Sequence, residues 1–200
     1  MGQFDSAISH LEKETEKRYS GKPLARHIRS VAEFARRIAG SLIKSDLLAE
    51  KAYVAGLAHD LYKGFSRKEL RELVVAESVP VDEDSLRIGG GLLHAPVAAH
   101  YIRTRLKITD DEILSAVYYH TTGHLNATTL DKILFCADYL DPWREIRARE
   151  PDVPALTKQA LVDLEEVYCT VLYRKLAYTL SKGRPLHPNG VAAWNQICSK

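Results

Sequence analysis

The sequence predicts an all-α protein of one domain, and three observations support this. Apolar residues recur at intervals of three and four along most of the 200 residues, as they do on the buried face of a helix. No segment shows the alternating pattern and turn residues of a β-hairpin, and no internal repeat is present. A chain of this length buries roughly 70% of its unfolded surface, so one core suffices to stabilise it.

The composition argues against several classes of protein. The chain is 46% hydrophobic and 27% charged, with a formal charge of +2, which is too mild to indicate nucleic acid or an anionic membrane as a partner. No run of 18 apolar residues is present. Three cysteines without a CxxC pair indicate neither a disulfide framework nor a cysteine zinc site. We therefore expect a cytoplasmic protein, the default for a chain without disulfides.

The first predicted helices have recognisable ends. A helix over 23–43 starts at a proline, a residue that suits the first helical turn. A second starts at Ser45 or Asp46, which are good capping residues, and is expected to end near Gly64. A capping-box pattern begins a third, short helix over 66–77.

The rest of the chain is predicted as one long connection, four helices and a final loop. The segment 78–93 contains Pro80 and three consecutive glycines, so we expect an irregular, mobile loop that covers the site. Helices are then expected over 95–106, 110–121, 127–141 and 154–182. Glycines and prolines after residue 182 predict a loop-like C-terminal part.

Histidines and aspartates interrupt the apolar faces of these helices. They are His27, His59, Asp60, His94, His120 and Asp138. Each alone has an ordinary explanation, such as a hydrogen-bonded core histidine or a carboxylate at a helix end. Together they explain one another as ligands, because a buried carboxylate or imidazolium is costly unless it is paired or binds a metal.

The residue types indicate which metals would bind. Imidazole and carboxylate suit Fe, Mn, Zn or related ions, and the absence of cysteine ligands weighs against a structural zinc. Six protein ligands exceed the needs of one catalytic metal and suit two ions about 3.5–4 Å apart, as in phosphoryl transfer. Asp60, next to His59, is placed to bridge both ions.

The order of these residues resembles that of a known superfamily. His27, then His59-Asp60, then Asp138 is similar to the pattern of HD-type metal-dependent phosphohydrolases, and His94 and His120 resemble its two-metal branch. Longer strings resemble the bacterial YqeK family: LAHDLYK at 57–63, LLHAPVAAHYI at 92–102, YYHTTG at 118–123, LDKILFCADYLDPWR at 130–144 and KGRPLHP at 182–188.

This resemblance implies a fold and an activity. The fold would be a helical HD-domain bundle with a di-metal centre in its core, forming one domain over 1–200. Its core would span about 20–145, and a long helix with a substrate-side segment would span about 154–190. The activity would be symmetrical hydrolysis of diadenosine tetraphosphate to two ADP by metal-activated water. The metal would be iron, with Mn, Co and Zn also compatible.

The resemblance also implies roles for individual residues. The metal ligands would be the six residues given above, with Asp60, Lys63 and Asp138 acting in catalysis. Lys63 would place a positive charge over the phosphates, and Asp138 would orient the attacking water. The implied nucleotide-contacting positions are Lys63, Thr121, Thr122, Gly123, Arg144, Arg184, Pro185, Leu186 and His187. The chain departs from the family pattern at Leu24, Ala98 and 124–127, none of which is an implied ligand.

Other functions remain open at this point. A different HD phosphohydrolase, acting on a nucleoside mono- or triphosphate, would use the same ligands. A nucleotide-binding regulator without turnover, and a helical scaffold with a histidine-rich core, are the alternatives from other classes. The last helix carries Tyr168, Tyr173 and Tyr178, which either pack inside or face a second subunit of a homodimer.

Overall fold

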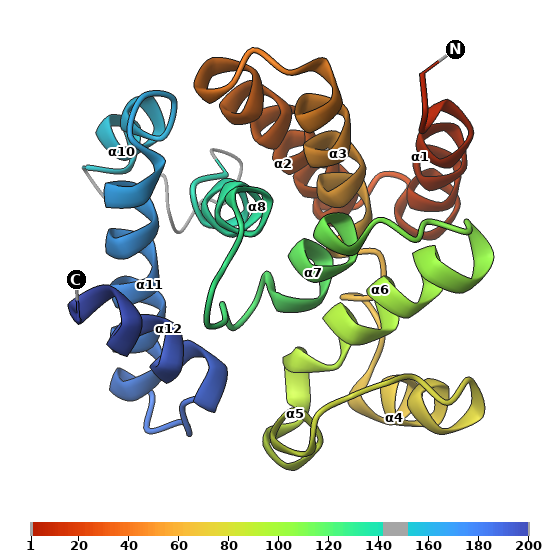
Figure 1. Cartoon of the computed structure of the whole chain (residues 1–200). Coiled ribbons are helices and arrows are strands. Elements are labelled where there is room, and N and C mark those ends of the chain that lie inside the picture. The colour runs from red at the N-terminus through yellow and green to blue at the C-terminus, as the bar shows by residue number, and fades with distance from the viewer. Residues whose placement is uncertain (1, 142–151, 200) are drawn as a thin grey trace.

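The computed structural model describes residues 2–141 and 152–199, and every regular element in these two ranges is a helix (Figure 1). The all-α prediction is therefore confirmed. Four helices form the centre of the molecule, where α2 packs on α3, and α7 and α8 pack on that pair. They are α2 (Pro23–Leu42), α3 (Asp46–Ala58), α7 (Asp111–Tyr119) and α8 (Thr129–Tyr139).

Other helices surround this centre. On one side α1 (Asp5–Tyr19) packs against α2 and α3, and α6 (His94–Arg105) packs against α7. Below them in Figure 1, α4 (Arg67–Ala76) packs against α6, and α5 (Glu83–Ile88) follows it along the chain. The result is a core enclosed on this side by helices from the first half of the chain.

The C-terminal helices form a second group on the opposite side of α8 (Figure 1). They are α10 (Val153–Gln159), α11 (Leu164–Ser181) and α12 (Pro188–Cys198). Helix α11 packs on α8, and α12 packs on α11. None of the helices in the described ranges is long and apolar enough to cross a bilayer.

Local sequence explains how several helices begin. The Ser66 hydroxyl accepts from the Glu69 amide while the Glu69 carboxylate accepts from the Ser66 amide, so the predicted capping box of α4 is confirmed. The Ser45 hydroxyl caps α3. Thr128 and Asp131 form a second capping box at the start of α8.

The structure corrects four predicted elements. The second helix ends at Ala58, and turns occupy 59–64. The segment predicted as irregular contains α5 and a 3₁₀ turn over Gly90–Leu92. The predicted helix over 154–182 is two helices, because the Asp163 carboxylate caps a new one by accepting from the Glu166 amide.

The fourth correction concerns the C-terminal part, which contains α12 in place of the predicted loop. Pro188 occupies the first turn of α12, where its missing N–H costs nothing, and the His187 side chain caps the helix. Gly190 serves close packing rather than a turn, because a Cβ at this position would lie 2.9 Å from the Thr122 carbonyl oxygen.

Candidate metal centre

The six histidines and aspartates singled out in the sequence meet in the core of the molecule. Their potential ligand atoms form two groups that share Asp60, with the atoms of each group within 4.8 Å of one another. One group is His27, His59, Asp60 and Asp138, and the other is Asp60, His94 and His120. All six side chains are buried. We call these six residues the His–Asp cluster.

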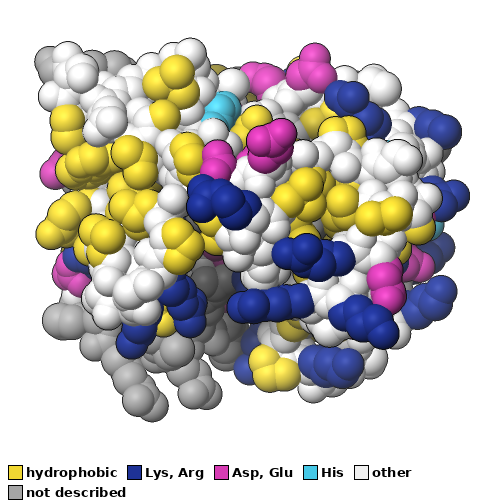
Figure 2. Space-filling model, turned by 90° about the horizontal axis from the view of Figure 1, so that it is seen from below, with side chains coloured by type: hydrophobic (Ala, Val, Ile, Leu, Met, Phe, Trp, Pro, Cys, Tyr) yellow, Lys and Arg dark blue, Asp and Glu magenta, His cyan; other side chains and the backbone are white. Residues whose placement is uncertain are grey.

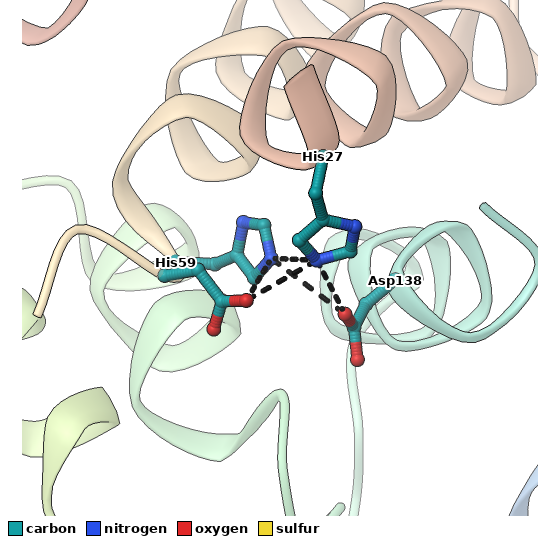
Figure 3. Close-up of side chains that lie close together, drawn as sticks. His27, His59 and Asp138 are labelled. Atoms are coloured by element: carbon teal, nitrogen blue, oxygen red, sulfur yellow. Dashed lines mark hydrogen bonds and ion pairs between the residues drawn. The ribbon is translucent and has the colours of Figure 1, made fainter. Parts of the chain in front are cut away.

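Helix α2, the turn that follows α3 and helix α8 supply the first group, as Figure 3 shows. His27 Nε2 lies 3.2 Å from Asp60 Oδ2 and 3.3 Å from Asp138 Oδ1. His59 Nε2 lies 3.4 Å from Asp60 Oδ2 and 3.6 Å from Asp138 Oδ1. Two imidazole nitrogens and two carboxylate oxygens thus converge on one small volume.

The second group forms around the other oxygen of Asp60. His94 Nε2 lies 3.0 Å from Asp60 Oδ1, and His120 Nε2 lies 3.5 Å from the same atom. The two imidazole Nε2 atoms are 3.1 Å apart. Because each oxygen of Asp60 faces a different group, its carboxylate has the arrangement of a bridge between two ions.

The hydrogen bonds of the four histidines orient their ring nitrogens. The carbonyl oxygens of Gly56, Gly91 and Val117 accept from Nδ1 of His59, His94 and His120. Each of these acceptors lies three residues before its histidine, and the three histidines lie at helix ends. A proton on Nδ1 leaves the lone pair on Nε2, which is the nitrogen that faces the cluster.

His27 has the same orientation but a different partner, which sequence reasoning missed. Its Nδ1 lies 2.6 Å from Asp141 Oδ2, and the Ser30 hydroxyl donates to Asp141 Oδ1 at 2.6 Å. Asp141 is fully buried and lies three residues after the ligand Asp138. That spacing of one helical turn was the signal in the sequence that would have found it.

Gly56 lets α2 and α3 pack closely enough for His27 and His59 to meet. A Cβ on Gly56 would lie 2.4 Å from Ala32 Cα, closer than real side chains approach a backbone. Only glycine therefore fits at this contact between α3 and α2. The same residue provides the carbonyl oxygen that orients His59.

Burial and charge set the protonation of the cluster. Burial disfavours the His27 imidazolium, but hydrogen bonds with Asp138, Asp141 and Asp60 outweigh this and raise the pKa of His27 to about 10. Although burial disfavours the Asp60 carboxylate, the charges of His59 and Lys63 hold its pKa well below its usual range. Burial, with the charges of His59 and His94, lowers the pKa of His120 to about 3 against the attraction of the Asp60 carboxylate.

These features fit divalent or trivalent metal ions. Carboxylates that stay ionised in a buried site require a compensating cation, and a metal ion would take that role by displacing the Nε2 proton of His27 and binding the Nε2 lone pairs of the four histidines. Asp60 Oδ1 is buried and has no hydrogen-bond donor among the residues of 2–141 and 152–199. Cys136 is buried elsewhere in α8 and is not part of the cluster.

Two lysines lie beside the cluster. Lys63 Nζ is 2.6 Å from Asp60 Oδ2, and its side chain is 39% exposed, so it joins the buried carboxylate to the surface. Lys175 of α11 donates to the carbonyl oxygen of His120 at 3.0 Å and lies 3.7 Å from Asp138 Oδ2. Sequence reasoning did not find Lys175, because only the packing of α11 on α8 places it there.

A cavity of about 450 Å³ adjoins the cluster. It borders Gly91, which holds His94, as well as Thr121, which follows His120, and Lys175. Its remaining lining comes from α4, the segment 88–92, Thr122, α11, residues 184–187 and Gly190. In the described lining the charged side chains are those of Arg67, Lys175 and Arg184, with no carboxylate. On the face seen from below in Figure 1, Lys and Arg side chains gather beside an apolar region (Figure 2).

The implied nucleotide-contacting residues fall in several places. The cavity is lined by Thr121, Thr122, Arg184, Pro185, Leu186 and His187. Gly123 forms the turn that follows, with a φ of 67°, and Lys63 lies beside Asp60. Arg144 lies outside the described residues. His124, at a departure from the family pattern, stacks on Tyr119 and pairs with Asp131 of the α8 capping box.

Comparisons with known proteins agree with this geometry. The HD domain family model matches residues 24–143. A symmetrical bis(5'-nucleosyl)-tetraphosphatase of Halalkalibacterium halodurans is 36% identical over 74% of this chain and 76% of its own length. The enzyme of the same name from Bacillus subtilis is 28% identical over 76% of this chain and 78% of its length.

A solved structure resembles the whole chain. It is described as a "predicted HD superfamily hydrolase involved in NAD metabolism" from Clostridium acetobutylicum. The TM-score is 0.81 at 29% identity, and the match covers 100% of this chain and 98% of the other.

Proposed function

This chain belongs to the HD-domain family, and we propose that it hydrolyses diadenosine tetraphosphate symmetrically to two ADP. The observation that carries the proposal is the buried His–Asp cluster next to a cavity whose charged lining is cationic. Diadenosine tetraphosphate carries several negative charges in its middle, so such a cavity suits it. Relatives whose names give this activity match about three quarters of the chain.

The cluster is proposed to hold two metal ions, with the carboxylate of Asp60 between them. His27, His59 and Asp138 would complete one site, and His94 and His120 the other. Iron is the proposed metal, and Mn, Co and Zn are compatible with the same donors. When bound, such ions lower the pKa of a water molecule and neutralise charge on phosphoryl oxygens.

The proposed reaction consumes one water molecule. The water oxygen bonds to a phosphorus beside the central bridging oxygen, and the bond from that phosphorus to the bridging oxygen breaks. The second ADP departs with the bridging oxygen, and the two protons of the water pass to the new terminal phosphates or to solvent. Asp138 is proposed to orient the water, because its side chain faces both the cluster and Lys175.

Cations and backbone amides are proposed to hold the phosphates. Lys63 is proposed to hold the reacting phosphate, and its ion pair with Asp60, which keeps its charge beside the cluster, supports this. Thr121, Thr122 and the Gly123 turn follow His120 directly, and Arg184 lines the same cavity as Thr121 and Thr122. Pro185 and Leu186 are proposed to contact the nucleoside, and Arg144 is proposed from the family resemblance alone.

We further propose one functional domain over 1–200, because the cavity is lined by both the N-terminal part and the C-terminal helices. A homodimer is proposed through the outer face of α11, where Tyr173 is 58% exposed and Tyr178 is 52% exposed. Tyr168 points inward against Phe135 and takes no part in that face. Three cysteines that form no disulfide are compatible with a reducing cytoplasm.

The products of hydrolysis test the proposed function. Purified protein of known metal content is incubated with diadenosine tetraphosphate, and the nucleotides are separated by ion-exchange chromatography. ADP as the sole product is expected. ATP together with AMP would place the attack at another phosphorus and contradict symmetrical cleavage. Release of phosphate from mononucleotides, without cleavage of the dinucleotide, would indicate a different HD phosphohydrolase.

A further inference from the structure

A partly buried polar contact joins two segments that wall the cavity. His187 precedes α12, and its Nε2 lies 3.2 Å from Asp82 Oδ1 and 3.1 Å from Ser85 Oγ. Asp82 and His187 are 105 residues apart in the sequence. His187 is 8% exposed and Ser85 is 4% exposed, whereas the Asp82 side chain is 36% exposed, so water reaches this contact mainly from the side of Asp82. We call these three residues the bridge.

The hydrogen bonds of the bridge fix the tautomer of His187. The Asn189 amide donates to His187 Nδ1 at 3.2 Å, so Nδ1 carries the lone pair and the ring proton lies on Nε2. Nε2–H then donates to Asp82 Oδ1, and the Ser85 hydroxyl donates to Asp82 Oδ2 at 2.8 Å. Both ring nitrogens therefore have protein partners, which leaves neither of them for a base or a phosphate.

Each end of the bridge is tied to the structure around it. Asp82 caps α5 by accepting from the Ser85 amide at 2.8 Å, and the Tyr118 hydroxyl of α7 donates to Asp82 Oδ2. His187 caps α12, and Gly190 of that helix packs closely against the Thr122 carbonyl oxygen. A movement of one cavity wall would therefore have to break the bridge or carry the other wall with it.

The bridge also connects to the metal centre through the chain. From Asp82 the backbone passes through α5 to the glycine turn, and the carbonyl oxygen of Gly91 accepts from Nδ1 of His94. The segment 82–94 is thus held by the bridge at one end and by the His–Asp cluster at the other. Residues 88–92, which line the cavity, lie between these two attachments.

We propose that His187 is a positioning residue, which acts through Asp82 and Ser85 to fix the spacing of the two cavity walls and thereby the KM for the dinucleotide. This replaces the direct nucleotide contact that the family resemblance implies for His187. The inference rests on the proposed function for its substrate. It requires that Asp82, which does not line the cavity among the described residues, affects KM as His187 does.

Two substitutions break the bridge but keep the helix caps. His187→Asn keeps a strong capping residue for α12, and Asp82→Ser keeps one for α5, but both side chains are too short to span the gap. Asp163→Ser is the matched control, because it makes the same change at the cap of α11, where the contact is with the Glu166 amide. Circular dichroism and metal analysis verify that each variant is folded and loaded.

Each bridge variant is expected to raise KM roughly three- to tenfold, the size expected from losing one hydrogen bond, with kcat and metal content unchanged. The double variant is expected to be no worse than either single one, because both break the same contact. The control is expected to match the wild type. An unchanged KM in Asp82→Ser, or additive effects in the double variant, would overturn the proposal and return His187 to direct contact with the nucleotide.

Hydrogen exchange provides a readout that needs no substrate. Amides of 184–190 and 83–92 are expected to exchange faster in both bridge variants than in the wild type and in Asp163→Ser. Because this result is independent of the nucleotide that is cleaved, it separates failure of the bridge from failure of the proposed function. Unchanged exchange in both segments would overturn the bridge itself.

Discussion

The His–Asp cluster and the walls of the adjoining cavity are held in place by different kinds of contact. The cluster lies where α2, α3, α7 and α8 pack through apolar faces, and a glycine against Ala32 sets the closest approach. The two walls that the bridge joins, 82–92 and 184–190, are short segments held by helix caps, glycine turns and the bridge, although α4 and α11 also line the cavity. Apolar packing suits a centre that must not move, and polar contacts suit walls that must admit a large ligand.

This difference predicts that substitutions in the two regions have different effects. Substitutions in the cluster and the helices beneath it should alter metal content and stability. Substitutions in the walls should alter KM while the metal is retained. The following experiments test that separation.

Asp60→Ala is expected to have the largest effect. It removes the only carboxylate that the two ligand groups share among the described residues, and with it the partner of Lys63. Metal content and turnover should both be lost, as measured by elemental analysis and product formation. Full activity in a folded Asp60→Ala protein would contradict the two-metal arrangement.

Lys63→Met tests a charge that belongs to the reaction rather than to the metal sites. We expect turnover to fall by about 100-fold, the size typical of losing one electrostatic contact in a transition state, with metal content intact. Lys68→Met is the control, because Lys68 is an exposed lysine of α4 whose ion pair is with Glu72. If kcat/KM stays at the wild-type value, Lys63 has no part in the site.

Gly56→Ala tests the packing beneath the cluster. The added methyl group meets the Ala32 backbone, so unfolding by urea should show a loss of about 1–3 kcal/mol, and His59 should hold metal less well. Gly40→Ala, also in a helix, is the control, because a Cβ there meets nothing within 4 Å. That variant should keep its metal and gain about 0.5–1 kcal/mol.

Gly190→Ala tests the wall in the same way. Its Cβ would lie 2.9 Å from the Thr122 carbonyl oxygen, so α12 should shift away from the turn that follows His120. We expect KM to rise by about threefold with metal content unchanged, since a modest wall displacement weakens about one contact. Loss of metal in this variant would contradict the separation between walls and cluster.

The smallest expected effect concerns pH. Burial disfavours the Asp131 carboxylate, but hydrogen bonds with His124 and Thr128 outweigh this and lower its pKa. The unfolded value is about 3.9, so its stabilisation of α8 is complete above that pH and is lost as the pH falls through the lower folded-state pKa. In urea unfolding between pH 6 and 3, Asp131→Asn should therefore show a shallower loss of stability than the wild type. Equal slopes would remove Asp131 from this account.

The contrast between packed helices and walls joined by distant contacts explains which features could be predicted from the sequence. The helices that carry His27 and Asp138 follow the 3.6-residue period, so their inward direction was readable, and the six side chains do meet. The start of α11 was missed although Asp163 and Glu166 have the spacing of a cap. The contact between His187 and Asp82 had no local signal, because it depends on the arrangement of segments far apart in the chain.

The measurement that tests the account most directly is metal titration of the stripped protein. Metal is removed by chelation and returned in known equivalents, and bound metal and diadenosine tetraphosphate cleavage are followed together. The shared position of Asp60 predicts that two equivalents bind per chain and that cleavage reaches its maximum only with the second. Full activity at one equivalent, or in protein without metal, would contradict the central claim.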